Sequence, residues 1–231
     1  TWELVRNLKS GRAIFSQPPM PIKCAGAPQK AMYLSCDAWL ERGVLTDIDV
    51  EFRNAGGVLF GVKEYVPALM EYVEKYGIDL KLNQTLVAVD GPAKKAVFKT
   101  EAGEETVEFD MLHAVPPQVA PQFVADSPLA NAESGFVDVN KLTLQHVRYP
   151  NVFGLGDAGS TPNAKTMAAA RKQAPIVAVN ALTQLDAKQP VADYDGYGSC
   201  PLTVERGKIV LAEFGYDGKL LPSFPKWLID G

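Results

Sequence analysis

Three cysteines are the residues of this chain best suited to covalent chemistry, because a deprotonated thiol is a strong nucleophile. Cys24 follows Lys23 and stands just before a predicted helix, and both features favour the reactive thiolate. Cys200 precedes Pro201, which favours an extended backbone at the cysteine. Cys36 falls inside the predicted helix, where we expect a structural role. For Cys24 and Cys200 taken singly, a buried and unreactive thiol is the alternative, since cysteine packs as a small hydrophobic residue.

The spacing of these cysteines does not match the common sulfur sites. They form neither a C-x-x-C pair nor a zinc-ligand pattern, and an odd count is unlike a secreted disulfide framework. The two histidines, His113 and His146, are isolated in the sequence. We therefore predict no metal site.

A second candidate site is the strand, turn and helix predicted over residues 151–166, which contains the letters GLGDAG. Asp157 would stand at the end of the strand, where its carboxylate can accept hydrogen bonds from hydroxyl groups of a ligand. The N-terminus of the following helix attracts negative charge, and Lys165 would lie in its first turn. Gly156, Asp157 and Lys165 thus suit a flavin, which carries hydroxyls and, when reduced, a negative ring. The alternatives are a glycine turn that only permits close packing and an exposed lysine over the helix start.

Composition and charge exclude several classes of partner. The chain has 231 residues, of which 47% are hydrophobic and 22% charged, as in ordinary globular proteins. A net charge of -4 without a cluster of lysine and arginine argues against nucleic acid. The apolar runs fall short of the roughly 20 residues that span a bilayer. Gly56, Gly57 and Gly61 lack the G-x-G-x-x-G spacing, so a tight turn or a relic of a dinucleotide site is favoured over nicotinamide binding.

Strand and helix patterns alternate in the first half of the chain. In chain order we predict a strand at 12–17, a helix at 25–43, a strand at 46–54, a helix at 62–77, and strands at 78–90, 94–100 and 106–117. The βαβαβ order, followed by antiparallel strands, predicts an α/β fold: a Rossmann-like parallel sheet covered by helices.

The pattern changes after the prolines at 116 and 117. A proline-containing connection leads to a short apolar strand within YPNVFGLGDAG, and a long helix is predicted at 164–185. Two strands then flank Arg206 and Gly207. We therefore divide the chain into three regions, 1–116, 117–186 and 187–231.

Several long stretches resemble the sulfide:quinone oxidoreductase family, particularly the branch of the mitochondrial enzymes and their bacterial relatives. The stretches are PIKCAGAPQKAMYLS, DMLHAVPP, VDVNKLTLQHVRYPNVFGLGDAG, NAKTMAAA, YDGYGSCPL and LAEFGY. The resemblance runs from about Trp2 to Pro225 and implies a flavoprotein with two dinucleotide-binding domains. It makes 1–116 the NAD-like domain, 117–186 the returning segment of the FAD domain, and 187–231 the start of the C-terminal region.

The resemblance also implies site residues. Cys24 and Cys200 match the redox-active pair, with Cys200 as the persulfide carrier and Cys24 as the thiolate facing the flavin. Gly156, Asp157 and Lys165 match positions near the FAD. Sulfide would be oxidised, electrons would pass through FAD to quinone, and a small acceptor would remove the sulfane sulfur.

Two parts of the family pattern are not in this sequence: the opening G-x-G-x-x-G unit and the complete C-terminal segment that holds these enzymes on a membrane. We expect the chain, itself soluble, to be the later part of a peripheral enzyme of the bacterial cytoplasmic or mitochondrial inner membrane. By itself it should bind FAD weakly or not at all. The alternatives are a type II NADH:quinone oxidoreductase, a flavocytochrome c sulfide dehydrogenase-like flavoprotein, and a scaffold or interaction fragment without activity.

Overall fold

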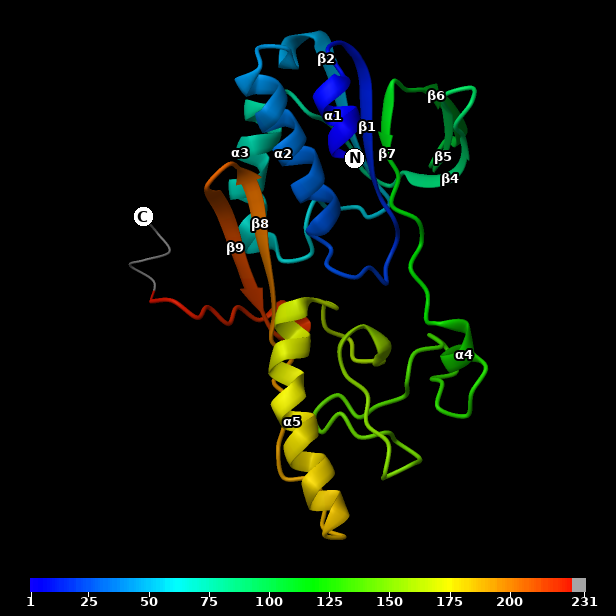
Figure 1. Cartoon of the computed structure of the whole chain (residues 1–231), viewed down its shortest axis with the longest axis vertical. Helices are drawn as coiled ribbons and strands as arrows, with labels where there is room; N and C mark the ends of the chain where they lie inside the picture. The colour runs from blue at the N-terminus through cyan, green and yellow to red at the C-terminus, as the bar shows by residue number, and fades with distance from the viewer. Residues whose placement is uncertain (226–231) are drawn as a thin grey trace. The chain divides into compact units, whose positions relative to one another are not determined.

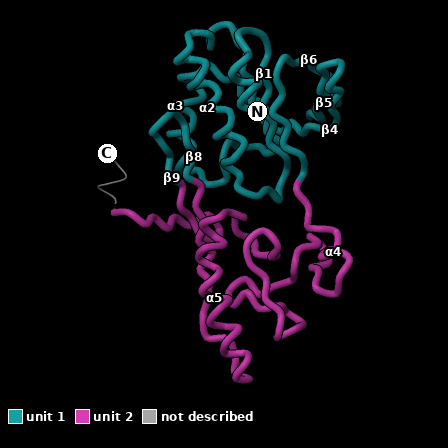
Figure 2. Tube along the Cα trace, in the orientation of Figure 1, with its two compact units in different colours: residues 1–117, 201–211 teal, residues 118–200, 212–231 magenta. Residues whose placement is uncertain are grey.

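The computed structural model describes residues 1–225 and forms two compact units (Figures 1 and 2). Unit 1 comprises residues 1–117 and 201–211, and unit 2 comprises residues 118–200 and 212–231. The chain therefore leaves unit 1 after Pro117 and returns to it briefly near its end. The predicted third region, 187–231, is divided between the two units.

Unit 1 is built on a parallel sheet. Its strands, in spatial order, are β3 (Asp79–Lys81), β2 (Ile48–Asn54), β1 (Gly11–Gln17) and β7 (Met111–His113). All three neighbouring pairs are parallel. The parallel sheet confirms the predicted α/β class.

Helices cover one face of this sheet. They are α1 (Trp2–Asn7), α2 (Ala27–Glu41) and α3 (Val66–Lys75), with 3-10 turns at Leu45–Asp47 and Lys63–Tyr65. Phe15 of β1 packs against Trp39 of α2, with ring centroids 6.3 Å apart. The helix α2 carries Pro28 in its first turn, where a missing N–H costs no hydrogen bond, and is followed by Gly43 at φ +68°. The predicted strand and helix positions in this part of the chain are confirmed.

A second sheet covers the opposite face. It is antiparallel and contains β4 (Thr85–Asp90), β5 (Lys95–Thr100) and β6 (Gly103–Glu108) in that order. Ile14, the neighbour of Phe15, packs into a cluster with Phe98 and Val107 of this sheet. Because side chains alternate along a strand, β1 contributes to the core on both of its faces.

Two predicted strands are in fact two elements each. The stretch 78–90 contains β3 and β4, which belong to different sheets and are separated at Asn83, a residue with φ +56°. The stretch 106–117 contains the end of β6 and then β7. The prediction of two continuous strands was wrong because hydrophobic and polar residues keep alternating from β3 into β4 and from β6 into β7. At each of these points the chain passes from one sheet to the other.

A buried arginine connects the two sheets of unit 1. The Arg53 side chain is 1% exposed, and its Nε and Nη1 lie 2.7 Å from Glu51 and Glu105. Its guanidinium also stacks 4.6 Å from the ring centroid of Phe98. These carboxylates raise the pKa of Arg53 against the opposing effect of burial. The buried arginine is therefore charged, and its charge is paired with Glu51 and Glu105.

Unit 2 has few regular elements. They are α4 (Gln122–Ala125), 3-10 turns at Gly156–Ala158 and Tyr216–Gly218, α5 (Met167–Leu185) and the ends of the hairpin described below. The strand predicted within YPNVFGLGDAG is present only as two isolated bridges, Gln145 to Phe153 and Val137 to Gly159. Val124, Val137 and Val139 form a small core beside it. The strand prediction was wrong because an apolar run forms a ladder only when a neighbouring strand pairs along its length.

A hairpin completes the described fold. Its strands are β8 (Gly198–Glu205) and β9 (Lys208–Phe214), joined at Gly207 with φ +83°. Within unit 1, the Tyr76 hydroxyl donates to the carbonyl of Val204 over 2.9 Å, and the Arg206 N–H donates to Asp37 over 2.9 Å. Among residues 1–225, no helix is long and apolar enough to cross a membrane.

Candidate functional site

Cys24 lies in the connection between β1 and α2, within unit 1. Its backbone adopts a left-handed conformation, with φ +55°, and its carbonyl accepts a 2.7 Å hydrogen bond from Ala27 N. This tight turn ends where α2 begins, and it leaves the cysteine partly exposed. A non-glycine residue in this conformation costs free energy, so the surrounding turn must impose it.

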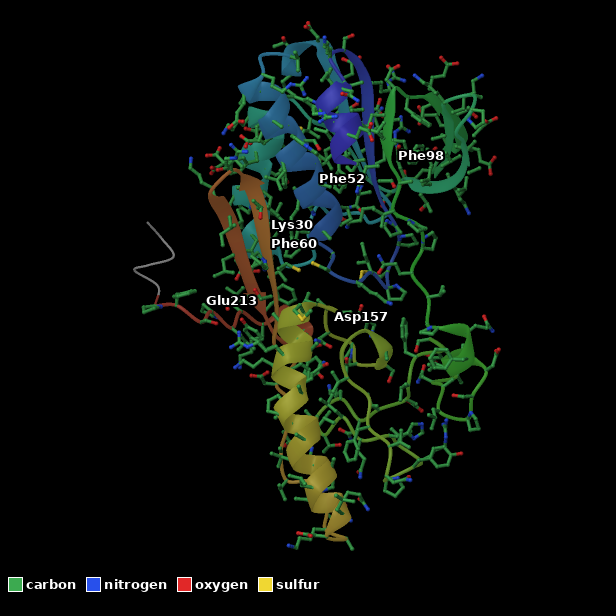
Figure 3. The ribbon with its side chains drawn as sticks, viewed as in Figure 1. Lys30, Phe52, Phe60, Phe98, Asp157 and Glu213 are labelled. Carbon is green, nitrogen blue, oxygen red and sulfur yellow. The ribbon has the colours of Figure 1, made fainter. Side chains whose placement is uncertain are left out.

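Lys30 of α2 is a charged group that lies at this thiol. Its Nζ donates to Cys24 Sγ over 3.8 Å, and the side chain lies near the first turn of the helix (Figure 3). Sequence reasoning considered the adjacent Lys23 and missed Lys30. A lysine in the first turn of a helix that follows a cysteine could have suggested this contact. An ammonium group favours the anionic form of a neighbouring sulfur.

Gln29 fixes the start of α2. Its Nε2 donates to the carbonyl of Leu59 over 2.7 Å, and both groups are buried. Its Oε1 accepts from the hydroxyl of Tyr33 over 3.3 Å. Gln29 lies in the first turn of α2, directly after the turn that carries Cys24. Its hydrogen bond to Leu59 therefore ties the start of α2 to the connection that follows β2.

Cys36 differs from Cys24 in every respect that matters for reactivity. It lies inside α2 and is fully buried. Burial raises the pKa of the Cys36 thiol far above its ordinary range, and the neighbouring Asp37 adds a smaller effect in the same direction. The structural role expected for Cys36 fits these surroundings.

Cys200 lies in β8 and is fully buried. Pro201 follows it within the strand and is exposed. The preceding Gly198 packs near Thr166 and Phe214 of unit 2. Cys200 is the last residue of its segment of unit 2, whereas Cys24 belongs to unit 1. The pairing of the two cysteines therefore stays a prediction.

The predicted flavin residues occur in unit 2 around a glycine turn. Gly156 has φ +61°, and its N–H donates to Gln173 Oε1 of α5 over 2.6 Å. At Gly154, a side chain would approach Val137 and Val139 to 3.1 Å, so close packing does constrain this turn. Asp157 lies at the turn and is exposed (Figure 3). Gln173 was not found from the sequence, because its partner is 17 residues away along the chain.

Lys165 is placed differently from the prediction. The helix α5 begins at Met167 rather than Ala164, because Thr166 is its N-cap and accepts a 3.1 Å hydrogen bond from Ala169 N. Lys165 precedes this cap, so it is not in the first turn. It is buried, its Nζ donates to the carbonyl of Gly159, and it stacks 4.5 Å from the ring centroid of Phe136. The exposed-lysine alternative is wrong.

These residues fit a flavin by their chemistry. The exposed carboxylate of Asp157 can accept hydrogen bonds from ribityl hydroxyls. The buried cation of Lys165, just ahead of the N-terminus of α5, favours negative charge nearby. Among residues 1–225, no cluster of three histidine, cysteine, aspartate or glutamate residues could hold a metal ion.

Comparison with protein-family models gave no match. Curated relatives do match. The chain is 42% identical over 227 residues to the mitochondrial sulfide:quinone oxidoreductase of Dictyostelium discoideum, covering 97% of this chain and 50% of the relative. The mitochondrial sulfide:quinone oxidoreductase of Mus musculus is 40% identical over 228 residues, covering 97% and 50%. That of Schizosaccharomyces pombe is 42% identical over 227 residues, covering 96% and 49%. The chain thus spans about half the length of these relatives.

Solved structures share the fold. A chain in the mitochondrial ATP synthase structure of Tetrahymena thermophila aligns with a TM-score of 0.82 and 26% identity, covering 99% of this chain and 56% of that one. The sulfide:quinone oxidoreductase of Aquifex aeolicus aligns with a TM-score of 0.74 and 16% identity, covering 99% and 63%. LpdA of Mycobacterium tuberculosis aligns with a TM-score of 0.58 and 13% identity, covering 97% and 42%. The last two likenesses concern the fold alone.

The relatives thus confirm the resemblance predicted from the sequence. The chain is a relative of the sulfide:quinone oxidoreductases and corresponds to about half of their length.

Proposed function

We propose that the full-length protein is a sulfide:quinone oxidoreductase in which Cys24 and Cys200 are the redox-active pair. The observation that carries this proposal is the identity of 40% to 42% with three enzymes of that name along nearly the whole chain. The surroundings of Cys24 support it, because Lys30 lies at hydrogen-bonding distance from the sulfur.

The two cysteines take different roles in the reaction. Hydrosulfide attacks the bridged pair at Cys200, so that a new sulfur–sulfur bond forms there and Cys24 leaves as a thiolate. Lys30 stabilises that negative charge. A small acceptor then removes the outer sulfur from the Cys200 persulfide, and oxidation of the two thiols restores the bridge with release of two electrons.

Bound FAD would supply the two-electron redox chemistry that links oxidation of the thiols to reduction of quinone. Asp157 would accept hydrogen bonds from its hydroxyls, and Lys165 would hold a positive charge near its ring. Gly156 lets the backbone turn tightly just before Asp157, since its φ is +61°. The 231-residue chain alone should bind FAD weakly or not at all, because it spans about half of its relatives. A stoichiometric flavin absorbance in the purified chain would contradict this expectation.

The remaining partners follow from the same proposal. They are quinone, a small sulfane-sulfur acceptor and a membrane surface that the full-length protein contacts peripherally. The relatives are named mitochondrial, which favours the mitochondrial inner membrane over the alternative, the bacterial cytoplasmic membrane.

The test is sulfide-dependent quinone reduction by the full-length protein and three variants. Cys24→Ser and Cys200→Ser should each abolish the reaction, and Cys36→Ala is the matched control that should keep it. Loss in only one of the first two would break the paired mechanism. If NADH reduced the flavin faster than sulfide did, the assignment to sulfide chemistry would be wrong.

A further inference from the structure

The carboxyl end of the parallel sheet in unit 1 carries two polar side chains that the proposed function does not use. Gln17 ends β1, and His113 ends the adjacent strand β7. The sheet order β3-β2-β1-β7 places β2 on one side of β1 and β7 on the other. The strand order therefore reverses between β1 and β7. In open α/β sheets, ligands bind at the carboxyl ends of the strands where the strand order reverses.

Gln17 and His113 lie on the same face of the sheet. Phe15 is the register partner of His113, and their rings are 5.7 Å apart. Gln17 is two residues beyond Phe15, so its side chain projects from the same face. Phe15 also packs on Trp39, which identifies this face as the one that α2 covers.

Each side chain has a buried polar atom without a hydrogen-bond partner among residues 1–225. The atoms are Gln17 Oε1 and His113 Nδ1. His146 shows the usual situation: its Nδ1 accepts from Arg148 N over 2.9 Å, and its Nε2 lies 3.1 Å from the carbonyl of Leu129. Leaving a buried polar atom unpaired costs free energy, so two such atoms at one sheet edge mark a place where a small hydrogen-bonding molecule would be stabilised.

The chemistry of the two atoms limits the ligand. Gln17 Oε1 only accepts hydrogen bonds, and Nδ1 of a neutral imidazole accepts or donates according to the tautomer. Burial lowers the pKa of His113, so the ring is neutral near pH 7. A small neutral molecule with hydrogens to donate and a lone pair to share satisfies both atoms, whereas an anion would be repelled by the glutamine carbonyl.

We propose that Gln17 and His113 form a binding site for such a molecule and that, given the proposed function, the ligand is hydrogen sulfide before it attacks the bridge between Cys24 and Cys200. Cys24 lies in the connection that leads from Gln17 to the first turn of α2. A helix that crosses between parallel strands begins near the carboxyl end of the sheet, which places this connection at the same edge.

The test compares Gln17→Met, His113→Phe and the double variant in the full-length enzyme. These apolar replacements of similar size should raise KM for sulfide, by roughly tenfold in the double variant, equivalent to about 1.4 kcal/mol. The kcat should change less than about twofold, because neither residue touches the reacting sulfur after capture. The melting temperature should rise by a few degrees, because unpaired buried polar atoms are removed.

His146→Phe is the matched control. It removes a histidine whose nitrogens are paired, so it should lower the melting temperature and leave KM for sulfide unchanged. An unchanged KM in the double variant of an active enzyme would overturn the proposal. A raised KM accompanied by a lowered melting temperature would also overturn it, since that result indicates a structural role.

A binding measurement separates this proposal from the proposed function. In a Cys24→Ser background, where sulfide cannot be captured, dissolved hydrogen sulfide should raise the melting temperature, and the Gln17→Met and His113→Phe changes should abolish the rise. A rise that survives both changes overturns the site. Failure of the unmutated enzyme to reduce quinone with sulfide would refute the proposed function and leave this binding test intact.

Discussion

Cys24 and Cys36 show how a short stretch of one polypeptide can give two thiols opposite properties. Cys24 stands before α2 in a turn, is partly exposed, and receives a hydrogen bond from Lys30. Cys36 stands inside the same helix, is fully buried, and has a pKa that burial raises far above its ordinary range. The difference arises from position relative to the helix: a residue in the preceding turn can face the helix's own lysine, whereas one on its inner face enters the core.

The largest expected effect is selectivity between these thiols. In the reduced full-length protein, an alkylating reagent at pH 7 should modify Cys24 at least ~10³-fold faster than Cys36, because Cys36 reacts only when the structure opens. Peptide mass spectrometry after timed labelling measures both rates in one sample. Comparable alkylation rates for Cys24 and Cys36 would contradict this prediction, because they would show that α2 opens readily.

The next effect is on stability. Cys36→Ser places a hydroxyl in an apolar site and should lower the free energy of unfolding by about 2 kcal/mol. Cys24→Ser, the matched substitution in the partly exposed turn, should change it by less than ~0.5 kcal/mol. Urea denaturation of the reduced proteins gives both values. Equal losses would mean that the turn at Cys24 is packed as tightly as the helix interior.

The contribution of Lys30 should be smaller. Lys30→Met should slow alkylation of Cys24 at pH 7 by roughly tenfold and move its rate profile to higher pH, because an adjacent cation favours the thiolate. Lys30→Arg should restore most of the rate. The exposed Lys188, paired with Asp186, provides the control Lys188→Met, which should have no effect. An unchanged pH dependence of the alkylation rate in Lys30→Met would show that the charge of Lys30 does not contribute to the difference in reactivity between Cys24 and Cys36.

The fold was predictable wherever one hydrophobic period persisted within a single element. The strand β1 and the helix α2 were found in this way, and Gly43 correctly marked the end of the helix. The separation of β3 from β4 at Asn83 was not found, because the alternation is the same on both sides and only the partner strands differ.

The candidate sites were predictable only in part. The chemistry of Cys24 follows from local sequence, but its assignment to Cys200 rests on resemblance, since spacing cannot relate residues so far apart. Lys165 was expected in the first turn of the helix, yet it precedes the N-cap and is buried against Phe136. Its contact depends on the fold around it, as does the contact of Gln173 with Gly156. The first residues at a site can be guessed from type and spacing, whereas their supporting partners require the tertiary structure.

The smallest expected effect concerns alkaline pH. The ordinary pKa of a thiol is 9.0, and burial holds that of Cys36 well above it. Below pH 9 the thiol is neutral in both the folded and the unfolded chain, so its contribution to stability is complete. As the pH rises past 9, the unfolded chain loses the proton and the folded one keeps it, which lowers the free energy of unfolding by roughly 1 kcal/mol per pH unit. Cys36→Ala should lack this loss. Urea denaturation at pH 8 and pH 10 measures the difference between the two proteins, and parallel pH dependences would show that Cys36 ionises as easily in the folded protein as in the unfolded chain.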